Sequence, residues 1–414
     1  MFPADTGGKI RTLNIVRELA RSHAITYLCN VQEGEQPAVA QMAALGLQVE
    51  TVPWRETSRE SWRFYAELAG NMLSPLPYNA AKDADVRLRQ RAEELLSRHV
   101  YDLVICDFVQ MAANAIGLEG PPKVLFQHNV EAEIFERHAQ HDQGALRRRF
   151  MAYQASKMRR FEGQAGRAFD TVIAVSDRDR RQFIERYGWR HVQTIDTAVD
   201  VDFFQPDGGT AEPELVSFVG SMDWLPNVDG VEFLMGSIWP RVREARPHAR
   251  LQIVGRNPTA EIRRYHGAAG VEVTGGVEDV RPYYAKSAVV VVPLRIGGGT
   301  RIKIYEAMAM AKPVVSTTLG AEGLSFVDGE QIEIADRPDL FANHIIDLLS
   351  DGERRKRMGE AARTHVSANF SAGVVARQFE QICLATARKS DSSAEKDVGT
   401  RTRLETCAAG RAED

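Results

Sequence analysis

The sequence predicts an α/β protein made of two domains, each built on a parallel sheet. Short apolar runs alternate with segments long enough for a helix, first over 24–175 and again over 215–316, a rhythm typical of βαβ units. A polar stretch rich in glycine and proline, 206–213, separates the two series and is typical of a linker. The length of 414 residues allows two or three domains of ordinary size. We therefore expect two halves of similar size with a cleft between them.

Composition and charge exclude several classes of protein. The 52 Lys and Arg nearly balance the 56 Asp and Glu, and the net charge of -4 gives no broad basic field of the kind that attracts nucleic acid. No stretch approaches the ~18 apolar residues of a membrane-spanning helix, and the first residues lack the apolar core of a signal peptide. The four cysteines fit neither a CxxC motif nor a disulfide framework. These observations predict a folded cytoplasmic protein without a nucleic-acid partner.

The first half opens with a glycine-rich loop, Asp5–Gly8, which runs directly into an amphipathic helix. The apolar runs that follow this helix are expected to form parallel strands at Ala24–Val31, Gly46–Val52, Asp102–Cys106, Lys123–Gln127 and Thr171–Val175. No strand precedes the loop. The first half therefore begins on a helix, which is unusual for a βαβ series.

The second half repeats the pattern and ends in helices. Its strands are expected at Leu215–Val219, Arg250–Val254, Val271–Thr274, Val289–Val292 and Val314–Ser316. The four consecutive valines at 289–292 are typical of a strand that is covered on both faces, because β-branched side chains disfavour a helix. The chain is expected to be helical from about 337 to 388 and to end in a disordered tail, 389–414.

The segment that follows the four valines predicts a phosphate site. A triple glycine, Gly297–Gly299, leads into a helix that ends before Pro313. In parallel α/β sheets, ligands bind at the carboxyl ends of strands, and glycines let backbone amides approach a phosphate at a helix N-terminus. Arg301 and Lys303 add two positive charges. A diphosphate is the ligand that this segment predicts.

Glu306 extends the predicted site. It lies three residues after Lys303, on the same face of the helix, where a carboxylate can accept hydrogen bonds from ribose hydroxyls. The alternative is that Lys303 and Glu306 form a solvated intrahelical pair and that the glycines only make a loop. No P-loop, G-x-S-x-G, H-E-x-x-H or strand-linked G-x-G-x-x-G motif is present, which argues against the corresponding NTPase, hydrolase, metalloprotease and dehydrogenase.

Four segments together resemble a known family. Gly297–Pro313, with Val219–Met222 and Ile253–Arg256, is similar to the C-terminal half of a GT-B fold glycosyltransferase of family 4. Thr197–Phe204 is similar to the element that joins the two domains of that family. The resemblance covers nearly the whole folded chain and is closest to members that make bacterial exopolysaccharide and other cell-surface glycans.

The resemblance implies two Rossmann-like domains that face each other across a cleft. Residues 1–205 would form the acceptor domain and 206–370 the nucleotide-sugar donor domain, with a C-terminal helix, 371–388, packing back on the first. Family members have a central strand before the loop that corresponds to 5–8. We therefore expect the first sheet to lack its first strand, and either the natural chain to begin upstream of Met1 or the first domain to be weakened.

The activity implied is transfer of a hexose from a nucleoside diphosphate sugar to a hydroxyl acceptor, with retention of configuration. The acceptor would be a glycan or a lipid-linked precursor, and neither a cofactor nor a metal is expected. The resemblance implies a catalytic role for His128, and the charge of Arg301 and Lys303 beside the glycine turn predicts catalytic roles for these two residues. We expect donor contacts from Gly297, Gly298, Gly299, Thr300, Glu306, Gly255, Arg256 and Glu322, and an acceptor or phosphate loop with Gly7, Gly8, Asp107 and Glu131.

The chain departs from the family pattern at two places. In the family, seven residues separate a first carboxylate from the one matched by Glu306, and this chain has Gly298 at the position of the first. The family also places an arginine and a lysine just after the strand that opens the second domain, whereas 220–227 contains no cation. We infer that Arg301 and Lys303 take over this charge. Two alternatives stay open, a catalytically silent nucleotide-sugar binding protein and a nucleotide-sugar epimerase of the same fold.

A basic segment predicts a possible membrane contact. Between 144 and 167 there are seven cations and one acid, within an expected helix that also carries apolar residues. Such a helix suits an anionic membrane and a peripheral position on the inner face of the cell membrane, although a solvated helix paired with acids elsewhere explains it equally well. A second aromatic-rich stretch is expected in the core, namely Trp54, Trp62, Phe64, Tyr65 and Met72.

Overall fold

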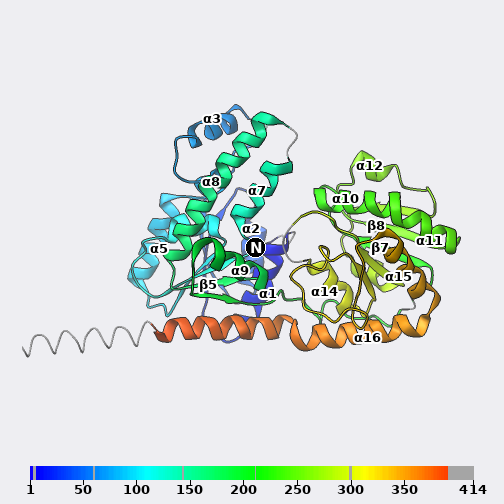
Figure 1. The fold of residues 1–414 in the computed structure, drawn as a ribbon. Helices are drawn as coiled ribbons and strands as arrows, with labels where there is room; N and C mark the ends of the chain where they lie inside the picture. The colour runs from blue at the N-terminus through cyan, green and yellow to red at the C-terminus, as the bar shows by residue number, and fades with distance from the viewer. Residues whose placement is uncertain (3–5, 59–60, 142–143, 210, 298–300, 390–414) are drawn as a thin grey trace, which may run out of the picture. The chain divides into compact units, whose positions relative to one another are not determined.

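The computed structural model describes residues 1–2, 6–58, 61–141, 144–209, 211–297 and 301–389 (Figure 1). The chain divides into two compact units, of which the first contains Met1–Ile195 and the segment from Ala376 onward, and the second contains Asp196–Val375. The division falls after Ile195, before the polar stretch that the sequence suggested as a linker. Apart from Lys389, the predicted disordered tail lies outside the described residues.

The strands of the first unit form two separate parallel sheets. β1 (Thr26–Val31) pairs with β2 (Gln48–Pro53) along its whole length. The other sheet has the order β3-β4-β5-β6 and consists of Val104–Asp107, Lys123–Gln127, Thr171–Ala174 and Val192–Thr194. Among the described residues, no strand pairs with the second edge of β1 or of β3. This division agrees with the expectation that the first sheet lacks a strand.

The helices of the first unit connect and cover these strands. They are α1 (Gly7–Leu19), α2 (Gln36–Ala43), α3 (Trp62–Asn71), α4 (Tyr78–Ala81), α5 (Val86–Arg98), a 3-10 turn (Val109–Met111), α6 (Ala112–Ala115), α7 (Glu131–His141), α8 (Ala145–Arg167) and α9 (Asp177–Tyr187). The core lies around β4 and β5, where Leu125 and Val172 are fully buried against Phe161 of α8.

The C-terminal helix, 372–389, packs on the first unit. Phe379 contacts Phe126 of β4 edge to face, with 5.1 Å between ring centres. The hydroxyl groups of Thr386 and Thr171 lie 2.8 Å apart, so a hydrogen bond joins this helix to β5. The chain therefore returns to the first unit after completing the second.

The second unit contains one parallel sheet of six strands. Their order is β12-β11-β10-β7-β8-β9, and their bounds are Glu333–Ile334, Val314–Ser316, Val289–Val292, Leu215–Val219, Arg250–Val254 and Val271–Gly275. From β7 the chain proceeds outward to β9 and then returns to the other side of β7 with β10. The order therefore reverses between β7 and β10, and the crevice at the carboxyl ends of these two strands is where such sheets bind ligands.

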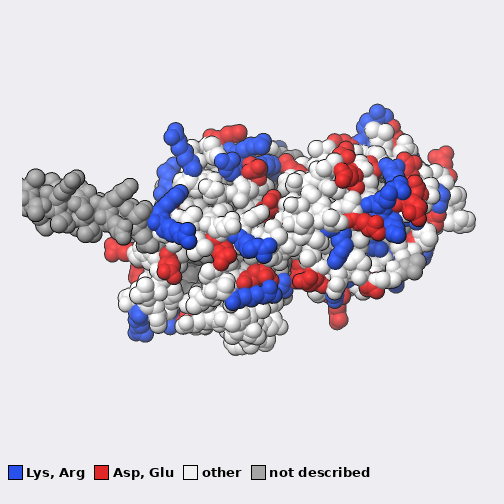
Figure 2. Space-filling model, turned by 90° about the horizontal axis from the view of Figure 1, so that it is seen from below, with Lys and Arg blue, Asp and Glu red and all other residues white. Residues whose placement is uncertain are grey.

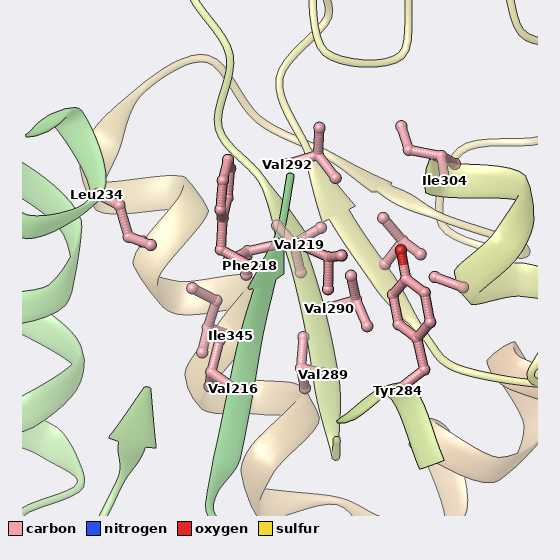
Figure 3. Packing of buried hydrophobic residues seen from close by; sticks show 14 of the residues in the cluster. Val216, Phe218, Val219, Leu234, Tyr284, Val289, Val290, Val292, Ile304 and Ile345 are labelled. Atoms are coloured by element: carbon pink, nitrogen blue, oxygen red, sulfur yellow. The ribbon is translucent and has the colours of Figure 1, made fainter. Parts of the chain in front are cut away.

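Helices cover both faces of this sheet. They are α10 (Leu225–Phe233), a π-helical turn (Leu234–Ile238), α11 (Trp239–Ala245), α12 (Ala260–Arg263), α13 (Arg281–Lys286), α14 (Ile302–Ala309), α15 (Pro338–Ser350) and α16 (Gly352–Asn369). Figure 3 shows Leu234 and Ile345 on one side of the valine-rich strands, and Tyr284 and Ile304 on the other. The four valines of β10 are buried, as their sequence predicted.

The second unit begins and ends at neighbouring positions. Val199, near its start, forms an isolated parallel bridge with Ser371, near its end. The Val199 amide donates to the Phe370 carbonyl at 2.9 Å, and the Ala372 amide donates to the Val199 carbonyl at 3.0 Å. These bonds hold the two ends of the unit together.

The structure corrects one sequence-based expectation about the core. Trp62 and Tyr65 of α3 are 74% and 63% exposed, and Met72 is also exposed, so most of the aromatic-rich stretch is not core. Trp54 and Phe64 are half-buried.

The charged residues do not separate by sign on the face seen in Figure 2, where Lys and Arg are interspersed with Asp and Glu.

Candidate active site

The glycine-rich turn predicted to bind phosphate follows β10 and leads into α14. Gly297 has a φ of +105°, a conformation that favours glycine, and a Cβ there would lie 2.7 Å from Cγ of Pro226. Gly298, Gly299 and Thr300, which were predicted to contact the donor, lie outside the described residues. The described part of the turn therefore lies against the start of α10.

Lys303, in the first turn of α14, reaches the loop that follows β7. Its Nζ donates a hydrogen bond to Oδ1 of Asn227 at 2.8 Å, and Nδ2 of Asn227 donates to the Ser221 carbonyl at 2.7 Å. A Cβ at Gly220 would lie 2.6 Å from Nζ, so this glycine makes room for the lysine. Burial, together with the charge of Arg301, lowers the pKa of Lys303 to about 7. A bound anion would favour its charged form.

Arg301 immediately precedes α14 and is only 4% exposed. Its guanidinium lies over the ring of Trp224, 5.1 Å from the ring centre. Trp224 immediately precedes α10, and the Asn227 that binds Lys303 lies in the first turn of that helix. The two predicted cations thus converge on 220–227, the segment that has no cation of its own.

Glu306 lies one turn deeper on α14 and is half-buried. The Tyr284 hydroxyl, from α13, donates to its Oε2 at 3.3 Å. Burial raises the pKa of Glu306 to about 7, while this hydrogen bond and Lys303 act in the opposite direction. Lys303 and Glu306 form no ion pair in the described part of the chain, so the alternative of a solvated intrahelical pair is wrong.

The loops after β7 and β8 are tied together. A Cβ at Gly255 would lie 1.8 Å from the Gly220 carbonyl oxygen, so glycine allows the two backbones to approach. Nε of Arg256 donates to Oγ of Ser221 at 3.0 Å, and Nδ2 of Asn257 donates to Asp223 at 2.9 Å. Arg256 therefore lies at the rim of the same loop that receives Lys303.

Glu322 belongs to the loop after β11, the strand next to β10. It is half-buried, and its amide donates to the Leu319 carbonyl at 3.3 Å. Glu322 thus follows the carboxyl end of a strand adjacent to the glycine turn, at the same edge of the sheet.

In the first unit, buried His128 follows the carboxyl end of β4 and pairs with Asp107, the last residue of β3. Their Nε2 and Oδ1 atoms lie 2.7 Å apart, and an Arg11 guanidinium nitrogen lies 3.0 Å from Nδ1 of the imidazole. Because an arginine only donates and a carboxylate only accepts, Nδ1 is the acceptor and Nε2 carries the proton. Burial lowers the pKa of His128, and Asp107 opposes this effect. This arrangement is that of a neutral, oriented imidazole.

The start of α1 covers this pair. Gly8 lies against Phe108, since a Cβ there would be 2.4 Å from the phenyl ring. The Phe108 ring stacks on the His128 ring with 4.0 Å between centres. Gly7 is exposed one residue earlier, and the Thr12 hydroxyl donates to Oδ2 of Asp107 at 2.9 Å. The structure therefore brings Gly8, Asp107 and His128 together, as the sequence grouped them.

Glu131 lies elsewhere, at the start of α7. Its side chain is buried and accepts a hydrogen bond from Nδ2 of Asn129 at 3.2 Å, and burial raises its pKa. Its amide donates to Glu162 of α8 at 2.9 Å. These contacts link α7 to α8, and no described hydrogen bond links Glu131 with His128 or Asp107.

Several residues of the site were not predicted from the sequence. Asn227 and Tyr284 hold Lys303 and Glu306, and Arg11, Thr12 and Phe108 surround His128. For Asn227 the sequence did offer a signal, because this polar residue lies in the segment 220–227, where the cations of the family pattern are missing. The others are brought to the site by folding alone.

Two family profiles match most of the chain. The one described as Glycosyltransferase Family 4 matches residues 6–203, and the one described as Glycosyl transferases group 1 matches 213–351. The chain is a GT-B glycosyltransferase of family 4. Each profile covers one of the two α/β series that were recognised in the sequence.

The curated relatives of this family 4 glycosyltransferase are distant. An uncharacterized 44.6 kDa protein in the cps region of Klebsiella pneumoniae is 24% identical over 74% of this chain and 81% of its own length. A GDP-mannose-dependent monoacylated alpha-(1-6)-phosphatidylinositol monomannoside mannosyltransferase of Corynebacterium glutamicum is 28% identical over 52% of this chain and 62% of its own length.

Solved structures share the fold of this glycosyltransferase. Anabaena HepE in complex with UDP has a TM-score of 0.63 and 15% identity, with 92% of this chain and 96% of that chain covered. WaaG, a glycosyltransferase involved in lipopolysaccharide biosynthesis, has a TM-score of 0.61 and 17% identity, with 92% and 97% covered. In the described residues, no helix is both long and apolar enough to cross a membrane.

Proposed function

We propose that this glycosyltransferase moves a hexose from a nucleoside diphosphate sugar to a hydroxyl group of a growing surface glycan or its lipid-linked precursor. The observation that carries the proposal is the convergence of Arg301 and Lys303 on the loop after β7. This convergence occurs at the switch point of a parallel sheet, beside the start of α14, where a phosphate is favoured. Two cations and the helix dipole suit the charge of a diphosphate.

The remaining donor contacts follow from positions on the same sheet edge. Glu306 would accept hydrogen bonds from the ribose hydroxyls, since it lies one turn beyond Lys303 on α14. Arg256 and Glu322, in the loops after β8 and β11, would flank the base and the sugar. The Anabaena structures bind UDP and UDP-glucose, and the Corynebacterium relative is named for GDP-mannose, so the proposal names the donor class and not the base.

The proposed reaction retains the configuration of the sugar. The bond between the anomeric carbon and the diphosphate oxygen breaks as the acceptor hydroxyl attacks from the same face, and the hydroxyl proton passes to the departing phosphate. Arg301 and Lys303 stabilise the charge that develops on this phosphate, so neither a metal nor a protein nucleophile is required.

The first unit is proposed to serve the sugar and the acceptor. His128, kept neutral by burial and oriented by Asp107, would contact the transferred sugar, and the exposed Gly7 with Gly8 would leave room for the acceptor at the start of α1. Because Phe108 covers the imidazole and has a φ of +67°, a displacement of this ring would open the histidine to substrate.

An anionic membrane is proposed to hold the acceptor near the first unit. Leu146 is exposed at the start of α8, followed by the exposed cations Arg147, Arg148 and Arg149. α3 lies beside α8 (Figure 1), and a 2.8 Å hydrogen bond from the Tyr153 hydroxyl to the Met72 carbonyl joins the end of α3 to α8. α3 also carries the exposed aromatic residues Trp62 and Tyr65. Apolar side chains next to cations suit the surface of an anionic bilayer.

Only part of the basic helix is available for this contact. Nζ of Lys157 is buried and donates to the Asn71 carbonyl at 2.6 Å, and Arg159 pairs with Glu136 of α7. The proposed membrane-binding surface therefore consists of the first turns of α8 together with α3, and not of the whole segment 144–167.

A transfer assay tests the proposed function. The protein is incubated with UDP- and GDP-hexoses and with lipid-linked glycans, and both nucleoside diphosphate and glycosylated product are measured. We expect stoichiometric release of both, an α-linked product from an α-linked donor by NMR, and unchanged activity in EDTA. Donor binding without release would indicate a silent binding protein, and a changed sugar without an acceptor would indicate an epimerase. Loss of activity in EDTA, restored by magnesium, would contradict the metal-independent mechanism.

A further inference from the structure

The first unit contains a cavity of about 370 Å³ just beyond the carboxyl end of β2. Trp54, the first residue after this strand, forms one wall, and Glu67, Gly70 and Asn71 of α3 form another. Tyr78, the first residue of α4, lines a third side. Cavities of this size at the carboxyl ends of parallel strands commonly bind small molecules. Of the described residues that line it, none belongs to the donor site or to the His128 pair.

Asn71 is 6% exposed and is fixed by two buried polar residues of α8. Nζ of Lys157 donates to the Asn71 carbonyl at 2.6 Å and to its Oδ1 at 3.0 Å, and Nε2 of Gln154 donates to the same Oδ1 at 2.9 Å. Burial of an ammonium group is costly unless hydrogen bonds compensate for it. Nδ2 of Asn71 donates to the Leu76 carbonyl at 3.1 Å. Because an amide nitrogen carries two hydrogens, one of them remains for a ligand.

The carboxylate of Glu67 joins two sides of the cavity. The Thr57 hydroxyl donates to its Oε1 at 2.6 Å, and the Tyr78 hydroxyl donates to its Oε2 at 3.1 Å. Among the described residues, no cation forms a salt bridge with Glu67. A carboxylate offers about four acceptor positions, so two of them remain for hydrogen bonds from a ligand.

The lining has the chemical character of a site for a neutral, hydroxyl-rich ring. Arg55 and Lys82 balance Glu56 and Glu67, and Nζ of Lys82 pairs with Oε1 of Glu56 at 3.0 Å. This balance disfavours a phosphate, and a lipid chain would leave the polar groups without partners. A sugar both donates and accepts hydrogen bonds, and the C–H groups on one face of its ring pack well on an aromatic ring such as that of Trp54.

The elements around the cavity also adjoin two features described above. α4 packs against the 3-10 turn 109–111, with Ala80 and Val109 buried in the same apolar cluster. This turn begins two residues after Asp107, which pairs with His128. α3 carries the exposed Trp62 of the proposed membrane surface. An extended molecule that filled the cavity could therefore contact both regions.

We propose that this cavity binds a neutral sugar residue of the acceptor glycan, located between its lipid end and its reacting end. The proposal rests on the proposed function, which supplies a glycan as the acceptor. Glu67 and Asn71 bind hydroxyl groups of this sugar, and Trp54 packs on its ring. The bound residue positions the acceptor, so that its terminal hydroxyl reaches the transferred sugar.

Two variants with matched controls test the cavity. A Cβ at Gly70 meets no atom within 4 Å, so Gly70→Leu places a side chain in the open space at the cavity wall, and leucine favours a helix more than glycine does. Ala69→Leu adds the same side chain to an exposed neighbour that does not line the cavity. Glu67→Gln removes the charge but keeps the shape, and its control is Glu119→Gln, at an exposed acid elsewhere in the first unit.

Sugar binding is measured on the full chain without a donor, by saturation-transfer NMR and by calorimetry. The probes are maltose, cellobiose, mannobiose and chitobiose, with inorganic phosphate as the anionic probe. We expect at least one disaccharide to bind the wild-type protein, and Gly70→Leu and Glu67→Gln each to weaken its binding at least about tenfold. The two controls should bind it as the wild type does, and the melting temperature of Gly70→Leu should not fall below that of the wild type.

Three results of this measurement would overturn the proposal: no binding of any disaccharide, disaccharide binding that Gly70→Leu leaves unchanged, or phosphate binding that Gly70→Leu abolishes. In the transfer assay, Gly70→Leu should raise the KM for an acceptor of several sugars at least about tenfold and leave the affinity for UDP or GDP unchanged. An unchanged acceptor KM would also overturn it. Failure of the wild-type protein to transfer any sugar would instead contradict the proposed function, because sugar binding is measured without transfer.

Discussion

Lys303 and Glu306 lie one turn apart on α14, and each has a pKa of about 7, reached from opposite directions. In the proposed donor complex a diphosphate would bind the charged form of Lys303, which is lost as the pH rises above 7. Ribose hydroxyls would donate to the ionised form of Glu306, which is lost as the pH falls below 7. The two groups would therefore limit donor binding on opposite sides of neutrality.

This opposition predicts a bell-shaped pH dependence of donor affinity. Titration calorimetry with UDP or GDP between pH 5.5 and 8.5 should give the tightest binding near pH 7. Lys303→Arg should remove the alkaline decline, because a guanidinium stays charged, and Glu306→Gln should remove the acidic decline. Affinity that does not change over this range in the wild-type protein would contradict the assigned roles.

Loss of either cation at the start of α14, Arg301 or Lys303, is predicted to lower the catalytic rate. Arg301→Ala and Lys303→Ala should each lower kcat by about 10²–10³, the usual cost of losing one preorganised contact to developing charge. Lys356→Ala, which removes an exposed cation from α16, is the matched control and should leave kcat unchanged. Wild-type rates in both site variants would refute the inference that these residues replace the missing cations of 220–227.

The close backbone approach at Gly255 predicts that adding one methyl group there destabilises the folded protein. Gly255→Ala would place a Cβ 1.8 Å from a backbone oxygen of Gly220, so we expect a loss of about 2–4 kcal/mol. Gly236→Ala is the control, because a Cβ there meets nothing within 4 Å, and its effect should stay within about 0.5 kcal/mol. Chemical denaturation followed by tryptophan fluorescence measures both, and similar losses would show that the close approach is unimportant.

At the residue scale, the sequence predicted the charged groups of the donor site but not their partners. Arg301, Lys303 and Glu306 are recognisable because they follow a glycine turn at helical spacing. Asn227 lies 76 positions from Lys303, and its contact depends on how β7 and β10 align in the sheet. Local spacing carries no information about such a long-range pairing.

At the scale of elements, the strands were predictable where several apolar residues occur in succession. β6 and β12 were missed because each is short and contains only one apolar residue, Val192 in β6 and Ile334 in β12, so neither gives an apolar run. α3 was misjudged for another reason. Its aromatic residues have helical spacing, but spacing does not reveal whether another element covers them.

The exposed residues of α3 and α8 predict membrane binding. Arg148→Ala/Arg149→Ala should reduce flotation with anionic liposomes by about 30-fold in partition coefficient, since each cation near an anionic surface contributes about 1 kcal/mol. Trp62→Ser should reduce binding further by removing an interfacial aromatic. The control is Lys356→Ala/Arg357→Ala, which removes equal charge from α16. Equal losses in both double variants would show a general charge effect and exclude a specific face.

At the scale of the whole molecule, the alternation of strands and helices was enough to predict the class and the two α/β series. Each run of apolar residues needs a helix to cover it, and this requirement leaves few arrangements. The exact division between units was not predictable, because the chain passes from one to the other at Ile195 without a change in composition. The return of the last helix to the first unit came from the family resemblance alone.

Stability should depend on pH through a buried acid. Burial raises the pKa of Glu162 to about 8, although its hydrogen bonds from Tyr187 and from the Glu131 amide lower it. The folded protein therefore holds a proton that the unfolded chain releases near pH 4.5, so stability is highest below pH 4.5 for this group and falls between pH 4.5 and 8. Glu162→Gln should flatten the decline of the melting temperature over this range, and an unchanged decline would contradict the assignment.

The bridge between Val199 and Ser371 joins the two ends of the second unit, which is inserted as one continuous segment between the two pieces of the first unit. Its ends are adjacent and its residues are contiguous, whereas the first unit is assembled from two separated pieces. A single gene fragment that encodes 196–375 would therefore carry a complete six-stranded sheet and every cation proposed to bind the diphosphate. Because its two ends are adjacent, we expect that this segment can be exchanged for the corresponding segment of another glycosyltransferase of the family without interrupting the first unit.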